Sequence, residues 1–336
     1  MRKEDINSLS EPYAQSRVTL DRRFHSAIGA DVPSAGILVK EIFNDLDIQS
    51  HGISWWQSFP AQERILISDY LYQCADSIEV NLVEARLHYL EWLDVRDRQN
   101  ARLADVISRS PYGELKRKYP PSIAPIDDLP NKLEGMHICG FFRAIGSSLD
   151  CLAGVIVGVL GLNSSLRWSD IGSVEAALKK LQPQGTPGSQ VQLDFRDLFE
   201  SAKKTSGPED WLAWASQYRN MFVHRGRRLA FGGFVPREVL LLDSEDQVIP
   251  RSKTQLHLAK YPDKSDAEAF IRKDVALNED ADTTFKGIFK STRDFLESMS
   301  ERLVSIWSAR RANTSLIEQP IIQWNTKIKP LQFRWL

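Results

Sequence analysis

The sequence has few cysteines and lacks several well-known site motifs. Its three cysteines are Cys74, Cys139 and Cys151, and no two of them form a C-x-x-C pair. An odd count without such a pair argues against a disulfide framework and against a zinc site, and it predicts a reducing, cytoplasmic location. No Walker loop, G-x-S-x-G motif or H-E-x-x-H motif occurs in the chain. The sequence therefore gives no indication of the nucleotide, serine or zinc chemistry that these motifs carry.

Long apolar runs and an excess of one charge are also absent. The longest apolar run covers residues 151–162, whereas a bilayer needs about 20 residues. We therefore expect a buried core helix there and no membrane span. The N-terminal MRKEDINSLSEPY has no apolar core, so we do not expect a signal peptide. The net charge of -1 excludes a strongly basic coat, so binding to RNA would need a local positive patch.

Apolar residues recur mainly at intervals of three and four, which predicts a mainly α-helical fold. Helices are expected over 37–48, 61–107, 134–162, 168–181, 191–203, 208–226 and 283–311. The stretch 61–107 contains neither proline nor glycine, but it is longer than a typical helix. We therefore expect a break or a protruding hairpin within it.

A proline-rich stretch between Tyr119 and Pro130 predicts an extended linker. On this basis the chain is divided into an N-terminal helical region (1–125), a helical bundle (130–312) and a C-terminal tail (313–336). Short apolar segments separated by turn residues predict a small β-hairpin inserted at about 231–261. By elimination, the N-terminal region is the candidate for sensing or for binding a partner.

The predicted helix 134–162 carries a seam of small residues. They are spaced four and three apart: Gly140, Ala144, Ser147, Cys151, Gly154, Gly158 and Gly161. Each glycine inside a helix costs roughly 1 kcal/mol relative to alanine, so close packing of backbones must offset that cost. Two interpretations remain open, namely tight packing within one bundle and a homodimer interface.

The segment YRNMFVHRGRR, residues 218–228, ends the predicted helix 208–226. Asn220 and His224 lie one helical turn apart and share a face. Arg219 lies about 140° around the helix from His224, within reach of its long side chain. Aromatic residues of the same helix already fill the core-facing positions, so His224 is not expected to be a core residue. These three polar residues are our candidate catalytic group.

The three side chains have complementary uses at a phosphodiester. An imidazole can accept the proton of an RNA 2′-hydroxyl or donate one to the leaving 5′-oxygen. A guanidinium binds non-bridging phosphate oxygens, and an amide can orient either partner. The following residues Arg225, Arg227 and Arg228 would supply a local positive patch for RNA. No metal or other cofactor is needed if the 2′-hydroxyl itself attacks.

The segment from Arg219 to His224 resembles the motif of the HEPN superfamily: an arginine, a polar residue and then a histidine after four to six intervening positions. Four residues intervene here, and Asn220 occupies the polar second position. The resemblance covers about residues 134–228, and the helix 283–311 is a candidate to close the bundle. It implies a small all-α bundle with Arg219 and His224 as the catalytic pair and Asn220 in support.

The same resemblance implies a function and partners. Many HEPN proteins are metal-independent endoribonucleases that leave a 2′,3′-cyclic phosphate and a 5′-hydroxyl. They typically form homodimers with one composite cleft, and they recur in toxin–antitoxin pairs and in antiviral defence. We therefore expect RNA as substrate, a homodimer, and a regulatory or antitoxin partner.

Two other functions remain open. One is a HEPN-like bundle that binds a nucleotide or a nucleic acid without cleaving it. The other is a helical scaffold or antitoxin-like protein in which the arginine-rich turn only ends a helix. Trp55 and Trp56 are interpreted mainly as packing residues at a helix start, with base stacking as the alternative.

Overall fold

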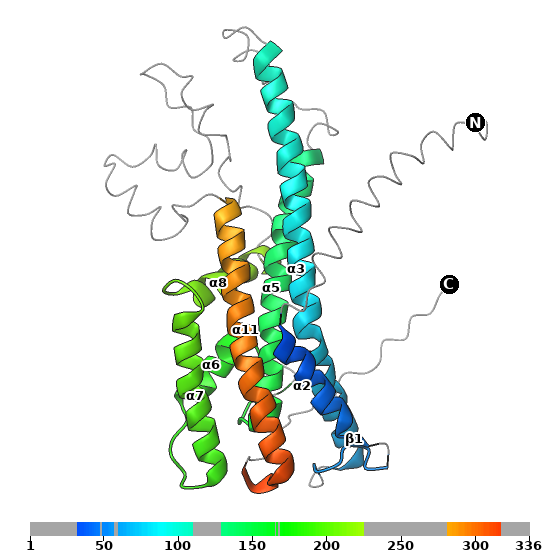
Figure 1. Ribbon diagram of the computed structural model, residues 1–336, viewed down its shortest axis with the longest axis vertical. Coiled ribbons are helices and arrows are strands. Elements are labelled where there is room, and N and C mark those ends of the chain that lie inside the picture. Colours follow the sequence, from blue (N-terminus) through cyan, green and yellow to red (C-terminus); the bar gives the residue numbers. More distant parts are fainter. Residues whose placement is uncertain are drawn as a thin grey trace, which may run out of the picture. The chain divides into compact units, whose positions relative to one another are not determined.

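The computed structural model describes residues 32–47, 49–56, 60–109, 129–164, 166, 169–224 and 281–316. Helices dominate these ranges (Figure 1), which confirms the prediction of a mainly α-helical protein. The helices are α2 (Pro33–Asn44), α3 (Ala61–Arg109), α5 (Leu129–Leu160), α6 (Ile171–Lys179), α7 (Pro187–Thr205), α8 (Trp211–His224) and α11 (Ala281–Ala312), followed by the 3-10 helix η3 (Thr314–Leu316). The predicted β-hairpin at 231–261 lies outside the described residues, as does most of the predicted linker.

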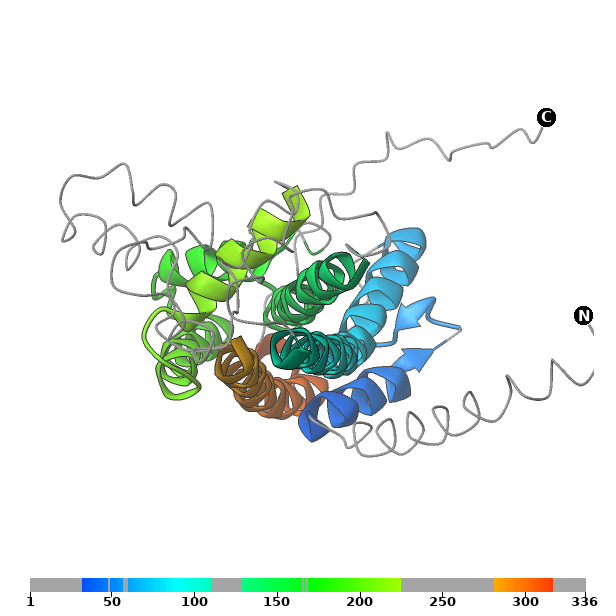
Figure 2. The ribbon, with the colours of Figure 1, turned by 90° about the horizontal axis from the view of Figure 1, so that it is seen from above.

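A pair of very short strands was not predicted from the sequence. Strands β1 (Leu46–Asp47) and β2 (Gly52–Ile53) pair antiparallel, with Leu46 opposite Ile53. They directly follow α2, and Figure 2 shows both arrows beside it. Gly52 has a φ of 124°, a conformation that favours glycine, and this permits the tight reversal. The paired segments are too short to show the alternating pattern by which a strand is recognised in a sequence.

The chain forms two compact units that interleave along the sequence. Unit 1 takes its described residues from 84–145, 210–224 and 281–290. Unit 2 takes them from 32–83, 146–209 and 291–316. The long helices α3, α5 and α11 each supply residues to both units. The candidate motif on α8 belongs to unit 1.

The expected break in the stretch 61–107 is wrong, because α3 is a single helix of 49 residues. The absence of proline and glycine removes the usual causes of a kink. Both halves also bury apolar side chains, such as Leu71 and Ile78 in unit 2 and Trp92 in unit 1. Tertiary packing between Ile67 and Val95 therefore supports a helix far longer than average.

In unit 2, both ends of α2 are bound to α11. The backbone nitrogen and the hydroxyl of Ser34 donate to the two carboxylate oxygens of Glu297, at 3.0 and 2.7 Å. At the other end, Asp45 Oδ2 accepts from Trp307 Nε1 at 2.7 Å and from Arg311 Nε at 2.8 Å. A carboxylate from another helix thus takes the place of a local N-cap on α2.

The C-terminal end of α5 is bound by a buried arginine of unit 2. Arg310 is 2% exposed, and its Nη1 donates to the carbonyls of Gly158 and Val159 at 3.3 and 3.0 Å. Its guanidinium lies 4.9 Å from the ring centre of Trp55 and 5.7 Å from that of Trp56. Burial lowers the pKa of Arg310 to about 9, so the side chain stays charged at neutral pH. The two tryptophans therefore pack around a core cation, which confirms the packing interpretation.

The small-residue seam of α5 is packed within the chain, as the first of the two interpretations predicted. A Cβ at Gly140 would lie 2.3 Å from the ring of His88 on α3. In unit 2, a Cβ at Gly154 would lie 2.9 Å from Cys74 Sγ, and one at Gly158 would lie 2.8 Å from Leu71. These glycines thus admit side chains of α3, and no second copy of the chain is needed to explain them.

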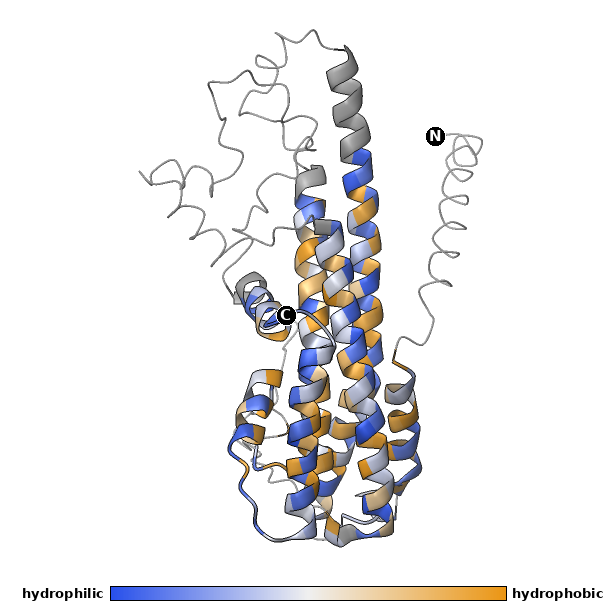
Figure 3. Cartoon of the chain, turned by 60° about the vertical axis from the view of Figure 1, so that its left-hand side comes forward, coloured by the Kyte–Doolittle hydropathy of each residue, from blue (hydrophilic) through white to orange (hydrophobic). Residues whose placement is uncertain are grey.

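The helix that contains this seam is long and apolar enough to cross a membrane. By length and composition alone the candidate span is Lys132–Leu160, and 78% of its most apolar window is buried by the rest of the protein. A core helix passes the same test. Figure 3 shows that the other helices carry both apolar and polar residues. Burial by protein therefore accounts for the apolar composition of α5.

Candidate active site at the end of α8

Helix α8 begins at Trp211, three residues after the predicted start at residue 208. The turn before it ends at Asp210, which has a φ of 59°, and Trp211 is the first helical residue. The backbone nitrogen of Trp214 donates to the carbonyl of Asp210 at 2.9 Å and forms the first helical hydrogen bond. The left-handed residue therefore fixes where α8 starts.

One face of α8 is anchored by aromatic packing within unit 1. The predicted core positions Trp211, Ala215 and Tyr218 are buried, and so is Leu212, which was not predicted. The side chain of Phe222, the fourth predicted core position, lies outside the described residues. Tyr218 packs against Trp214, with ring centres 4.0 Å apart and ring planes inclined by 30°. Both rings lie 5.7 Å from that of Phe142 on α5, which also approaches Phe285 of α11 at 5.8 Å. Such a cluster holds the helix at a fixed rotation about its axis.

The next turn of α8 carries the motif. Arg219 is half-buried and Asn220 is exposed. The guanidinium Nη1 of Arg219 donates to Oδ1 of Asn220 at 2.9 Å. His224 is the last residue of α8, and its backbone position is one helical turn beyond Asn220 on the same face. The structure therefore pairs Arg219 with Asn220 and places His224 at the helix end, while the His224 side chain lies outside the described residues.

The remaining predicted site residues are not tested by the structure. Arg225, Arg227 and Arg228 all lie beyond the described end of α8. The positive patch they would form stays a prediction. Over the described ranges, no group of three or more His, Cys, Asp or Glu side chains is arranged to hold a metal ion.

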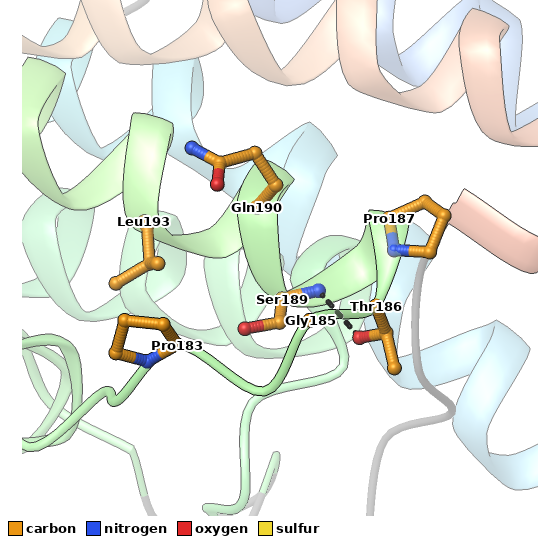
Figure 4. A pocket seen from close by; sticks show the side chains of 7 residues that line it. All are labelled: Pro183, Gly185, Thr186, Pro187, Ser189, Gln190 and Leu193. Atoms are coloured by element: carbon orange, nitrogen blue, oxygen red, sulfur yellow. Dashed lines mark hydrogen bonds between the residues drawn. The ribbon is translucent and has the colours of Figure 1, made fainter.

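A concave pocket of about 340 Å³ lies elsewhere, at the start of α7 in unit 2. Figure 4 shows its seven lining residues: Pro183, Gly185, Thr186, Pro187, Ser189, Gln190 and Leu193. The hydroxyl of Thr186 accepts from the backbone nitrogen of Ser189 at 3.1 Å and caps α7. None of the lining side chains is charged, and the hydroxyls of Thr186 and Ser189 bond backbone groups of the turn. The pocket therefore does not compete with the motif as a candidate site.

The structure brings together two histidines from distant parts of the sequence. Nδ1 of His88 lies 3.2 Å from Nδ1 of His137, within unit 1. The two residues are 49 positions apart, on different helices. No spacing rule in the sequence links them, so only the packing of α3 against α5 reveals the pair.

Searches of family models, curated proteins and solved structures find no match to this chain.

Proposed function

We propose that this chain is a metal-independent endoribonuclease of the HEPN type. The observation that carries the proposal is the hydrogen-bonded pair of Arg219 and Asn220, 2.9 Å apart, one turn before His224 at the end of α8. An arginine oriented by its neighbour, in the same helix as a histidine at the helix end, suits the binding of a phosphodiester, whose charge the guanidinium neutralises. Support also comes from the mainly helical fold, in which α8 packs on α5 and α5 also contacts α11.

In the proposed reaction, Arg219 binds the non-bridging oxygens of the scissile phosphate. His224 accepts a proton from the 2′-hydroxyl or donates one to the departing 5′-oxygen, and a second copy of the motif supplies the complementary proton transfer. The attack of the 2′-oxygen on phosphorus breaks the bond to the 5′-oxygen. The products are a 2′,3′-cyclic phosphate and a 5′-hydroxyl. Asn220 acts through Arg219 and is a positioning residue.

The wider biological role is proposed on the same basis. The enzyme would act as a cytoplasmic homodimer with a composite cleft. Its activity would serve as a toxin or in antiviral defence, restrained by a regulatory or antitoxin partner. Arg225, Arg227 and Arg228 would extend the binding surface for RNA.

The test is cleavage of single-stranded RNA by the full chain in EDTA, with analysis of the product ends. We expect cyclic phosphate ends, and loss of cleavage in His224→Ala and Arg219→Ala. Arg196→Ala is a matched control, because Arg196 also pairs with its neighbour, Asp197, through Nε at 2.9 Å on the surface of another helix. Binding of RNA without cleavage would indicate the binding module instead. Cleavage by His224→Ala at the wild-type rate would exclude the proposed mechanism.

A further inference from the structure

Two histidines from different helices of unit 1 face each other through the same ring nitrogen. Nδ1 of His88 on α3 lies 3.2 Å from Nδ1 of His137 on α5. The ring centres are 5.4 Å apart and the ring planes are inclined by 55°. The side chain of His88 is 21% exposed, so the ring is partly open to solvent.

A carboxylate lies behind the first histidine. Nε2 of His88 is 3.6 Å from Oε1 of Glu84, and Arg143 Nη2 donates to that same oxygen at 2.9 Å. A carboxylate on this side favours the tautomer with the hydrogen on Nε2, so Nδ1 of His88 accepts the hydrogen bond from Nδ1–H of His137. An ion that binds both Nδ1 atoms would replace this hydrogen, which moves to Nε2 of His137. In metal sites a carboxylate commonly orients the histidine from this side, and Glu84 lies 3.6 Å from Nε2, just beyond hydrogen-bond length.

Gly140 makes room for this arrangement. A Cβ at this position would lie 2.3 Å from Cε1 and Nε2 of His88. The imidazole therefore rests against the backbone of α5, and any larger residue would displace it. Gly140, the first residue of the seam, therefore sets how closely the His88 ring approaches the backbone of α5, the helix that carries His137.

We propose that His88 and His137 form a two-histidine binding site for a divalent transition-metal ion such as Cu²⁺, Ni²⁺ or Zn²⁺. Two nitrogen ligands at about 2.0–2.1 Å from a tetrahedral ion lie about 3.4 Å apart. The observed separation of 3.2 Å is close to this value. A small rotation of each ring would direct both lone pairs at one point.

A metal ion would bind both imidazoles in their neutral form. Within the described part of the chain no group of three or more ligand side chains gathers, so water fills the remaining positions. An open site with two protein ligands should follow the usual order, with Cu²⁺ bound more tightly than Zn²⁺.

The test is a titration of the full chain with Cu²⁺ and with Zn²⁺ in chelator-free buffer, followed by calorimetry and by thermal unfolding. We expect the wild type to bind one ion per chain at this site, and we expect His88→Gln and His137→Gln each to bind one ion fewer. The unfolding equilibrium constant of the wild type should fall about 100-fold when the free ion reaches 100 times its Kd. His51→Asn, in the turn between β1 and β2, should bind as the wild type does.

A second measurement needs no variant. The electron paramagnetic resonance spectrum of the Cu²⁺-loaded wild type should show coupling to two imidazole nitrogens. Unchanged binding in both glutamine variants, a spectrum without two imidazole nitrogens, or the absence of binding at millimolar ion would each overturn the proposal. The site does not depend on the proposed nuclease reaction, which uses no metal ion and should persist in EDTA.

Discussion

Arg219 donates from Nη1 to Oδ1 of Asn220 at a distance of 2.9 Å, so the arginine of the motif is oriented by its own neighbour. We expect Asn220→Ala to lower kcat/KM for RNA cleavage roughly 10-fold, the usual effect of losing one hydrogen bond to a charged group. Asn220→Asp should lower it further, because a carboxylate would neutralise the guanidinium and repel phosphate. Single-turnover cleavage of a defined RNA measures both. Full activity in Asn220→Asp would show that Arg219 does not need this partner.

Two glycines of α5 should respond in opposite ways to alanine. A Cβ at Gly140 would lie 2.3 Å from the His88 ring, whereas one at Gly135 meets nothing within 4 Å. Gly140→Ala should lower the free energy of unfolding by about 1–3 kcal/mol through overpacking. Gly135→Ala should raise it by up to about 1 kcal/mol through helix propensity. Urea denaturation measures both, and equal stabilisation by the two substitutions would contradict the packing of His88 on α5.

Adjacent arginines of α11 should contribute very differently to stability. Arg310 is buried and binds the carbonyls of Gly158 and Val159, so Arg310→Met should lower the free energy of unfolding by about 2–4 kcal/mol. Arg311 is exposed and pairs with Glu41 and Asp45, so Arg311→Ala should change it by about 1 kcal/mol or less. Chemical denaturation of the two variants tests this ranking. A larger loss in Arg311→Ala would contradict it.

Acidification should lower the free energy of unfolding through the protonation of one carboxylate in unit 2. Burial would raise the pKa of Glu175, but the hydrogen bonds from Lys179 and Lys203, at 2.6 and 2.8 Å, outweigh it and lower the pKa below its usual value of 4.5. Because the folded pKa is the lower one, the stability from Glu175 is present above pH 4.5 and is lost as the pH falls through the folded pKa. Glu175→Gln should flatten the stability profile below pH 4.5. An unchanged acid slope in that variant would show that the pair contributes nothing.

The sequence predicted where most helices lie, because apolar periodicity and end signals act over short distances. The predicted helix 191–203 corresponds to α7 and 283–311 to α11, each within a few residues. The buried face of α8, with Trp211 and Tyr218, also followed from spacing alone. The long α3 was the exception. Its length depends on partners along both halves, which periodicity cannot show.

The sequence by itself determined a mainly helical protein and the chemical content of its motif, since residue type and helical spacing are local properties. Only the tertiary structure decided that the glycines of α5 receive side chains of α3, that Arg310 binds the end of α5, and that His88 meets His137. These contacts join residues far apart in the chain, and their partners are chosen by shape and burial when the helices pack. Residue type and helical spacing, which are local, do not predict these contacts.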